Sequence, residues 1–217
     1  LLASSAASDV YKRQADIGGY DLVKPLEDFD SVTAQGLNGA VFALLALNAD
    51  RADTNGELEQ KYLTYIVDQE KPDGGFSLDD SSDTADVDLT AMTLQCLEPY
   101  ATEEEISAII DRGVEFLADA QAEDGGYEAY GDKSSESVSQ VILALCALER
   151  DPEKDETFTK KESTLLDALA KFRKEDGIYM HEKADEEGSA MATYQAMIAL
   201  EAVQKLRTEK KWIFDFK

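Results

Sequence analysis

The sequence contains one turn three times: QEKPDGGF at residues 69–76, QAEDGGY at residues 121–127 and DGIY at residues 176–179. The aspartates of successive copies, Asp73, Asp124 and Asp176, are 51 and 52 residues apart. Self-similarity at a fixed period of about 20–50 residues is typical of repeat proteins, in which each repeat is one supersecondary unit. The turn therefore marks the same point inside each repeat, and the segments around it decide the fold class.

The segment before the second turn predicts an amphipathic helix over residues 103–121. Its apolar residues recur at steps of three and four, which is the spacing of one buried stripe: Ile106, Ile109, Ile110, Gly113, Val114, Leu117 and Ala120. Thr102 and Glu105 have the spacing of a capping box at its start. Gly125 and Gly126 follow its end, where glycine adopts the left-handed conformation easily.

The segments after the turns are apolar on almost every side, which is typical of interior helices. Residues 138–148 (VSQVILALCAL) are a clear example. We therefore expect inner apolar helices to alternate with outer amphipathic ones. The inner helices are predicted over 37–49, 86–97, 135–149 and 189–206, and the outer helices over 57–69, 103–121 and 163–174. Two such layers form either a closed α/α barrel or an open solenoid, and the repeat pattern leaves both open.

The composition excludes several classes of partner. The 217 residues include 46 acidic and 21 basic side chains, which gives a net charge of −25. Such a surface repels phosphate backbones and anionic membranes, so we expect no nucleic-acid partner. We also expect no membrane span, because no apolar stretch reaches the roughly 20 residues that one needs. The excess acid is interpreted as a solvated exterior, and no cofactor is predicted.

Metal ligands are sparse in the sequence. Cys96 and Cys146 lie inside apolar helical runs and are expected to be buried small hydrophobes, while His181, the only histidine, lies in a polar loop. No spacing supports a tetrahedral zinc site, so we predict none. The acidic residues between the first turn and the next helix could instead bind Ca²⁺ through oxygens, although a solvated loop is the favoured interpretation: Asp79, Asp80 and Asp83.

Residues 112–127 carry a resemblance to a known family. Arg112-Gly113-Val114-Glu115-Phe116-Leu117, then Gln121 and Gly125-Gly126-Tyr127, resembles the QW repeat of terpene cyclases, with Tyr127 in the place of tryptophan. The copy at residues 61–76 agrees with one shift, and the third copy has Phe172 where glutamine is expected. In such a repeat, the glutamine can bond backbone groups left open at the helix end, and the aromatic side chain can pack on the next repeat.

The chain is therefore similar to the squalene cyclase and protein prenyltransferase repeat family, and in particular to secreted bacterial proteins with prenyltransferase/squalene oxidase repeats. This resemblance implies an all-α fold, an α/α toroid over residues 18–207. Roughly four hairpins are counted, fewer than in the family's full toroid, so an incomplete ring is expected. It also implies an extracellular or cell-surface location and covalently linked neighbouring domains, with residues 208–217 leading toward a downstream module. Residues 1–14 (LLASSAASDVYKRQ) look like a translated adapter from a metagenomic read.

The stretch Asp86-Val87-Asp88-Leu89-Thr90-Ala91 resembles the DxDDTA motif of class II terpene cyclases. The resemblance puts Asp88 in the place of the proton donor, but Leu89 replaces the third aspartate. Protonating an alkene needs a neutral acid in an aromatic-lined cavity, and Trp212, the only tryptophan, lies in the tail. We therefore predict no catalytic residue and interpret Asp88 as a helix N-terminal carboxylate. The alternative is a cyclase-like enzyme that uses Asp86 and Asp88.

Polar or aromatic residues associated with the inner helices are candidates for ligand binding: Gln35, Asn38, Asp88, Gln95, Gln140, Tyr194 and Gln195. Gln140 and Gln195 occupy corresponding repeat positions. They either line a central cavity or satisfy polar groups between helices, and the second interpretation is favoured. The predicted function is a non-catalytic extracellular ligand-binding or scaffold module, whose ligand would be a small organic compound such as a corrinoid or a glycan. A purely structural spacer is a further alternative.

Overall fold

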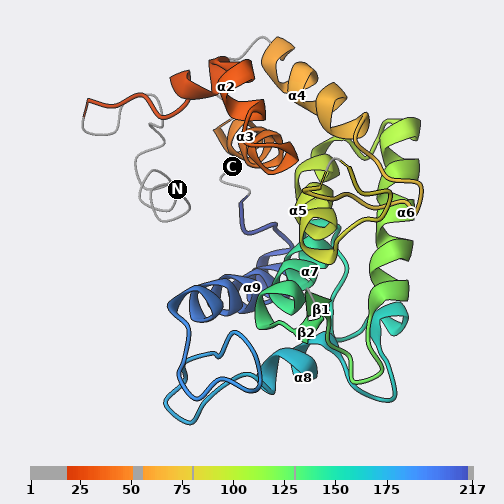
Figure 1. The fold of residues 1–217 in the computed structure, drawn as a ribbon, viewed down its shortest axis with the longest axis vertical. Coiled ribbons are helices and arrows are strands. Elements are labelled where there is room, and N and C mark those ends of the chain that lie inside the picture. The colour runs from red at the N-terminus through yellow and green to blue at the C-terminus, as the bar shows by residue number, and fades with distance from the viewer. Residues whose placement is uncertain (1–18, 51–55, 80, 130, 215–217) are drawn as a thin grey trace. The chain divides into compact units, whose positions relative to one another are not determined.

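The computed structural model describes residues 19–50, 56–79, 81–129 and 131–214, so the segment 1–14 and Asp80 lie outside the described residues. The fold is all-α, as predicted (Figure 1). The inner helices are α3 (Leu37–Asp50), α5 (Val87–Leu97), α7 (Ser135–Ala147) and α9 (Ala190–Glu209). The outer helices are α4 (Glu57–Val67), α6 (Glu104–Ala120) and α8 (Leu165–Ala170), and α2 is a short helix (Phe29–Thr33).

Short elements complete the structure. The 3-10 helices are η1 (Lys24–Glu27), η2 (Glu98–Tyr100) and η3 (Glu156–Phe158). Strands β1 (Glu128–Ala129) and β2 (Asp132–Lys133) pair antiparallel, and the ion pair between Lys133 and Asp124 ties this ribbon to the second turn. The sequence does not predict this ribbon, because two-residue strands are too short to show an alternating pattern.

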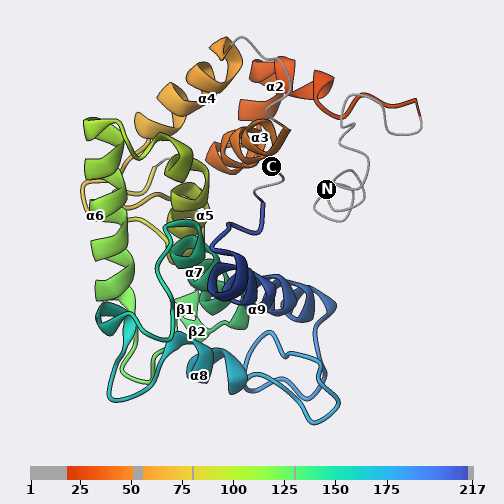
Figure 2. The same cartoon turned by 180° about the vertical axis from the view of Figure 1, so that it is seen from behind.

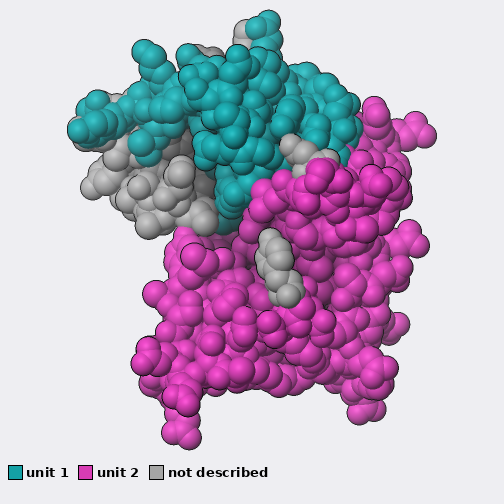
Figure 3. Space-filling model, viewed as in Figure 1, with its two compact units in different colours: residues 1–69, 214–217 teal, residues 70–213 magenta. Residues whose placement is uncertain are grey.

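The chain forms two compact units, residues 1–69 with 214–217 and residues 70–213 (Figure 3). In the first unit, α3 packs against both α2 and α4. The Tyr62 hydroxyl of α4 donates to the carbonyl of Leu26 at 2.7 Å, and the Tyr62 ring packs on Phe29 with 5.0 Å between centroids. A buried aromatic with a satisfied hydroxyl therefore fixes α4 against the segment before α3.

In the second unit, inner and outer helices alternate as predicted. Helix α7 lies between α5 and α9, while α6 packs on α5 and α8 packs on α7 (Figures 1 and 2). Every residue of α7 is buried, which confirms the prediction of an interior helix there. Helix α9 is instead buried along one stripe, and Met191 and Met197 are more than three-fifths exposed. The apolar pattern of residues 189–206 therefore overstated the burial of that helix.

The three turns have the same backbone geometry. In each, the amide three residues before the left-handed glycine donates to the carbonyl of the residue after it, at 2.8, 2.9 and 2.8 Å. The glycines Gly74, Gly125 and Gly177 have φ of 86°, 85° and 90°, a region that favours glycine. The third turn was inferred from four residues, and its agreement with the other two confirms the repeat.

The aromatic residue of each turn fixes the start of the following inner helix. Phe76, Tyr127 and Tyr179 are buried. Their carbonyls accept hydrogen bonds from the amides of the N-cap residues Asp86, Ser134 and Ser189 at 2.8, 3.2 and 2.8 Å. The predicted role of glutamine is also confirmed in the second repeat, because the Gln121 side-chain nitrogen donates to the carbonyls of Gly125 and Phe158, both at 2.9 Å.

Two local predictions were wrong. Helix α6 begins one residue later than a Thr102 cap requires: its N-cap is Glu103, with no side-chain cap bond, so the capping box of Thr102 and Glu105 does not form. A capping box occurs in α8 instead, between Thr164 and Asp167. Helix α8 is also shorter than predicted, because the backbone amides of Lys171 and Phe172 donate to carbonyls three residues back in a tighter turn.

Within the described ranges, none of the helices has the length and apolar character needed to cross a membrane.

Candidate functional site

Capping brings polar side chains to the starts of the inner helices. Asp86 caps α5, its Oδ1 accepting from the Leu89 amide at 2.7 Å. Ser134 caps α7 and Ser189 caps α9 in the same way, each accepting an amide hydrogen bond at 3.2 Å. A residue two positions after such a cap lies in the first helical turn, where the helix dipole favours a negative charge. Asp88 of α5 and Glu136 of α7 occupy this position.

The environment of Asp88 differs from that of an exposed helix-start carboxylate. Burial raises the pKa of Asp88, and the charges of Asp86 and Glu136 raise it further, whereas the Ser137 hydroxyl and His181 lower it. Asp88 lies in the first turn of α5, as predicted. Burial is the largest influence on its pKa, and it acts against the stabilisation that the helix start gives to the charged form.

Two buried polar atoms near Asp88 make no hydrogen bond within the described residues: Oδ1 of Asp88 and Oγ of Ser137. Ser137 is fully buried, and its hydroxyl acts on the Asp88 carboxyl as a weak hydrogen-bond partner that lowers its pKa, although no bond of full hydrogen-bond geometry joins the two. Buried polar groups are almost always paired, because an unpaired one loses its hydration without compensation. The junction between α5 and α7 therefore retains unused hydrogen-bonding capacity.

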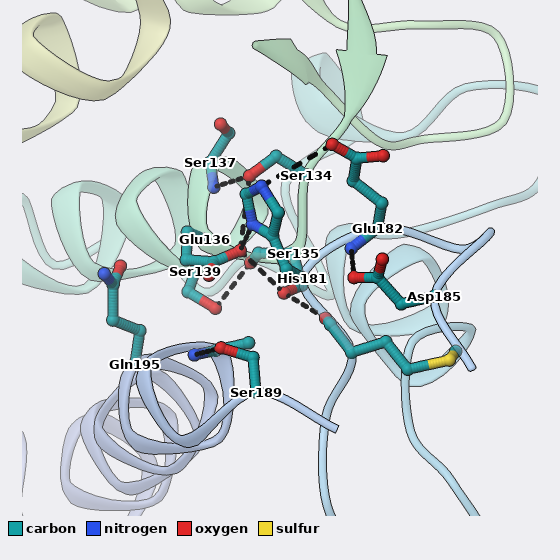
Figure 4. A network of polar contacts seen from close by, with 12 residues as sticks. Ser134, Ser135, Glu136, Ser137, Ser139, His181, Glu182, Asp185, Ser189 and Gln195 are labelled. Atoms are coloured by element: carbon teal, nitrogen blue, oxygen red, sulfur yellow. Dashed lines mark hydrogen bonds and ion pairs between the residues drawn. The ribbon is translucent and has the colours of Figure 1, made fainter. Parts of the chain in front are cut away.

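Glu136 forms a second polar contact at the start of α7 (Figure 4). It is buried, and its Oε2 lies 2.8 Å from Nδ1 of His181 and 3.0 Å from the Ser135 hydroxyl oxygen. On the other side of the ring, Nε2 lies 3.6 Å from Oε1 of Glu182. The hydrogen bond with Glu136 raises the pKa of His181. Burial opposes this effect, and the charges of Glu136, Glu182 and Asp185 add to it.

The sequence predicts no zinc site at His181, and it does not predict the contact of His181 with Glu136. The two residues are 45 positions apart and belong to successive repeats. One sequence feature could have predicted this contact: the only histidine follows the third turn by a few residues. Because each turn is fixed against the start of an inner helix, a residue just after it can reach the neighbouring repeat.

Gln140 and Gln195 are brought together with a third glutamine. The Gln95 side-chain nitrogen donates to Oε1 of Gln140 at 3.1 Å, and the Gln140 nitrogen donates to Oε1 of Gln195 at 2.9 Å. Gln95 also donates to the carbonyl of Ala91 at 3.2 Å. One glutamine from each of α5, α7 and α9 therefore forms a glutamine ladder across the three inner helices, as expected for polar groups that satisfy one another between helices.

The other candidate residues lie apart from this polar junction or in the other unit. Tyr194 is on α9, 39% exposed, and burial of part of its ring raises its pKa. Gln35 and Asn38 lie in the first unit, just before α3 and in its first turn, where Gln35 is exposed and Asn38 is half-buried. Whether these residues contact a ligand remains a prediction.

The acidic loop after the first turn uses its carboxylates locally. Oδ1 of Asp79 accepts from the amide and the hydroxyl of Ser81, at 2.9 and 2.6 Å, and these bonds lower the pKa of Asp79. Asp83 is exposed. Across the part of the chain that the structure describes, no three His, Cys, Asp or Glu side chains converge as metal ligands would.

Both cysteines are buried free thiols, which confirms their interpretation as small hydrophobes. Burial raises the pKa of Cys146 to about 12, with a further contribution from the charge of Asp151. A thiol with so high a pKa is almost wholly protonated at neutral pH and is a poor nucleophile.

Comparison with known protein families relates the chain to a described domain. A family model described as the prenyltransferase alpha-alpha toroid domain matches residues 21–215. No curated protein matches the chain. The matched span contains all the helices described above and all the residues of the junction between α5 and α7.

Proposed function

The chain belongs to the prenyltransferase alpha-alpha toroid family, and from this premise we propose that it is a non-catalytic module that binds a small ligand within a larger extracellular bacterial protein. The observation that carries the proposal is a pair of buried atoms at the junction of α5 and α7, Oδ1 of Asp88 and Oγ of Ser137, which no hydrogen bond of full geometry satisfies. A ligand group that bridges these atoms would recover the free energy that burial without a partner costs.

The surroundings of Asp88 support binding over alkene protonation. In the cyclase-like motif the third aspartate would stand at residue 89, but Leu89 is there and its side chain is buried in the core, 1% exposed. The carboxylate of Asp86 is already occupied, because it accepts from the amides of Leu89 and Leu78. Trp212 follows α9 near the end of the chain, outside the inner helices. The third carboxylate of the cyclase motif is therefore missing beside Asp88, and the only tryptophan of the chain lies outside the inner helices.

The charges at the junction indicate which ligands it would favour. Asp86, Asp88 and Glu136 act on one another there, so an anionic ligand would be repelled. A neutral ligand rich in hydroxyl or amide groups can donate to Oδ1 of Asp88 and exchange hydrogen bonds with the Ser137 hydroxyl. Glycans and the amide side arms of corrinoids have this chemistry. The extracellular location is proposed from the resemblance to secreted bacterial repeat proteins.

A thermal-shift screen tests the proposal. The probes are cyanocobalamin and a panel of soluble neutral oligosaccharides. A ligand at about a hundred times its Kd stabilises the folded state by ~2.7 kcal/mol, which is roughly 5–11 °C for a chain of this size. We expect such a shift for the unmodified protein and for Asp119→Asn, a control at an exposed carboxylate on α6, and its loss in Asp88→Ala and Ser137→Ala.

Two results would contradict the proposal. One is the absence of any shift with every probe, which would favour a spacer or scaffold without a ligand. The other is the formation of a cyclised product from polyprenyl substrates that disappears in Asp88→Asn, which would establish the enzymatic alternative.

A further inference from the structure

We propose that residues 180–188, the segment between the third turn and α9, form a pH-sensitive strap that is held on the start of α7 while His181 is protonated and loosens when His181 loses its proton. We call residues 180–188 the strap. The inference does not depend on the proposed ligand, because it concerns only how the strap attaches to its neighbouring helix.

The strap has two kinds of attachment to α7. The first is insensitive to pH: the Ser135 hydroxyl donates to the carbonyl of Met180 at 2.7 Å, and the Ser135 amide donates to the carbonyl of His181 at 3.1 Å. The second is the contact of 2.8 Å between Nδ1 of His181 and Oε2 of Glu136, which joins an ionisable side chain of the strap to a buried carboxylate of the helix (Figure 4).

The flanks of the strap are anchored independently of His181. Before it, Tyr179 is buried, and its amide donates to the Thr193 hydroxyl of α9 at 2.9 Å. After it, the Ser189 amide donates to the carbonyl of Tyr179 at 2.8 Å. Release of the His181 side chain would therefore loosen the strap without undoing the turn before it or the helix after it. The bonds to Ser135 and the hydrogen bond from Nζ of Lys174 to the carbonyl of Glu186, at 2.6 Å, would still hold the strap in place.

Carboxylates from three parts of the chain surround the imidazole. Glu136 comes from α7, Glu182 and Asp185 come from the strap, and Asp88 of α5, itself beside Asp86, interacts electrostatically with His181. Within the strap, the Glu182 amide donates to Oδ2 of Asp185 at 2.9 Å, so both strap carboxylates are held near the ring. Lys183 is exposed and lies next to Glu182 in the sequence. A protonated His181 thus offsets several negative charges that would otherwise repel the strap from α7.

Deprotonation changes the charge but leaves one hydrogen bond. A neutral imidazole that keeps its proton on Nδ1 still donates to Glu136. The other nitrogen, Nε2, then presents a lone pair to the Glu182 carboxylate 3.6 Å away, where it previously presented a proton. That change acts within the strap, because Glu182 belongs to it. The attachment to α7 weakens because the hydrogen bond to Glu136 is no longer charge-assisted and the positive charge that offset Glu136 and Asp88 is lost. The strap should therefore loosen without complete local unfolding.

The direction of the pH dependence follows from the pKa of His181, which is raised in the attached state. The extra attachment is complete below the ordinary histidine pKa of about 6.5 and is lost as the pH rises through the raised value. The size of the effect follows from linkage. Each unit by which the pKa of His181 in the attached strap exceeds its pKa in the free strap corresponds to a tenfold change in the attachment equilibrium. Burial also raises the pKa of Asp88, from an ordinary aspartate value of about 3.8 that is well below that of histidine.

Two independent measurements test the strap. Because His181 is the only histidine, its ring gives a single set of NMR signals, and their titration yields its pKa in the full chain and in a peptide of residues 178–188. Trypsin cleavage after Lys183 reports release of the strap. The cleavage rate is measured between about pH 6 and pH 8.5 in the protein and in the peptide. The normalised cleavage rate is the rate in the protein divided by the rate in the peptide, which removes the pH dependence of the protease itself. We expect a higher pKa in the protein, and a normalised cleavage rate that rises with pH by tenfold for each unit of that difference.

Substitutions separate the ionic contact from general stability. His181→Gln should make the normalised cleavage rate independent of pH, and Glu136→Gln should lower the pKa of His181 toward the peptide value and flatten the pH profile. Glu153→Gln, which removes a carboxylate paired with Arg207, is the matched control and should change neither. Circular dichroism establishes that each variant is folded. The proposal is overturned by a histidine pKa equal to that of the peptide, by a cleavage ratio that does not change with pH, or by an unchanged pH profile in His181→Gln.

Discussion

Gly75→Ala is expected to destabilise the second unit, whereas Gly126→Ala, at the same position of the next turn, is not. Both glycines immediately follow the left-handed glycine of their turn, and neither has a φ that excludes alanine. A Cβ on Gly75 would lie 2.6 Å from the Ala85 side chain and 2.7 Å from Oγ1 of Thr90. A Cβ on Gly126 would meet no atom closer than 3.5 Å. The two sites therefore differ in available space rather than in backbone conformation.

The magnitude follows from what must move at Gly75. Overpacking a well-packed site costs about 1–3 kcal/mol. The displaced Thr90 hydroxyl accepts a buried hydrogen bond from the Phe76 amide at 2.9 Å, and weakening that bond adds ~1 kcal/mol. Together these give about 2–4 kcal/mol, or a fall in Tm of roughly 4–16 °C for a chain of this size. At Gly126, alanine restricts the unfolded chain and should stabilise the protein by about 0.4–1 kcal/mol.

Urea unfolding followed by circular dichroism at several wavelengths compares the two variants with the unmodified chain. Hydrogen exchange at the Phe76 amide provides a local readout and should be faster in Gly75→Ala, because its acceptor has moved. The reasoning fails if Gly75→Ala is as stable as Gly126→Ala, since the close contacts in the first turn would then have no energetic consequence.

Three further substitutions test other contacts. Arg207 lowers the pKa of Asp151 to about 2. This pair therefore contributes its full stability above the ordinary aspartate pKa of about 3.8, and the contribution is lost as the pH falls toward 2. Arg207→Gln should remove this part of the acid sensitivity when unfolding is measured between about pH 2 and pH 5. Gln140→Leu breaks both bonds of the glutamine ladder and should lower the free energy of unfolding by about 1–3 kcal/mol in urea. Gln195→Leu breaks only one bond and should lower it by less. Equal losses in the two variants would contradict the ladder. Tyr127→Phe removes a buried hydroxyl that donates to the carbonyl of Leu117 at 2.8 Å and should lower the free energy of unfolding by about 1 kcal/mol. Tyr194→Phe, at a partly exposed position, should change it by less than about 0.5 kcal/mol. The reverse order would show that the Tyr127 bond is unimportant.

The junction of α5 and α7 was only partly predictable. The cyclase-like motif drew attention to Asp88, but burial of its carboxylate and the unpaired Ser137 hydroxyl depend on how closely the two helices pack. His181 was evaluated as a metal ligand because residue type was the only information available for it. Its partner, Glu136, was not considered at all, since a buried glutamate at a helix start looks like any other acidic residue in a chain with 46 of them.

The glutamine ladder also shows that the sequence does not reveal which side chains pair between helices. Gln140 and Gln195 each lie six residues after the N-cap of their helix, so repeat correspondence relates them. Gln95 lies nine residues after its N-cap and does not correspond to either, yet it completes the ladder. Correspondence in sequence identifies equivalent positions, but side chains pair according to their positions across the helix interface.

The amino-acid sequence by itself determined the repeat, the order of inner and outer helices and most of their limits. These features depend on interactions among residues a few positions apart, namely the helical period, the N-caps and a glycine turn with one backbone geometry. Tertiary structure alone decided which side chains meet across neighbouring repeats, how deeply α9 is buried, and which charges act on His181. Those outcomes depend on the spacing and rotation of stacked helices, which shift a side chain between solvent and contact without any change in the local pattern.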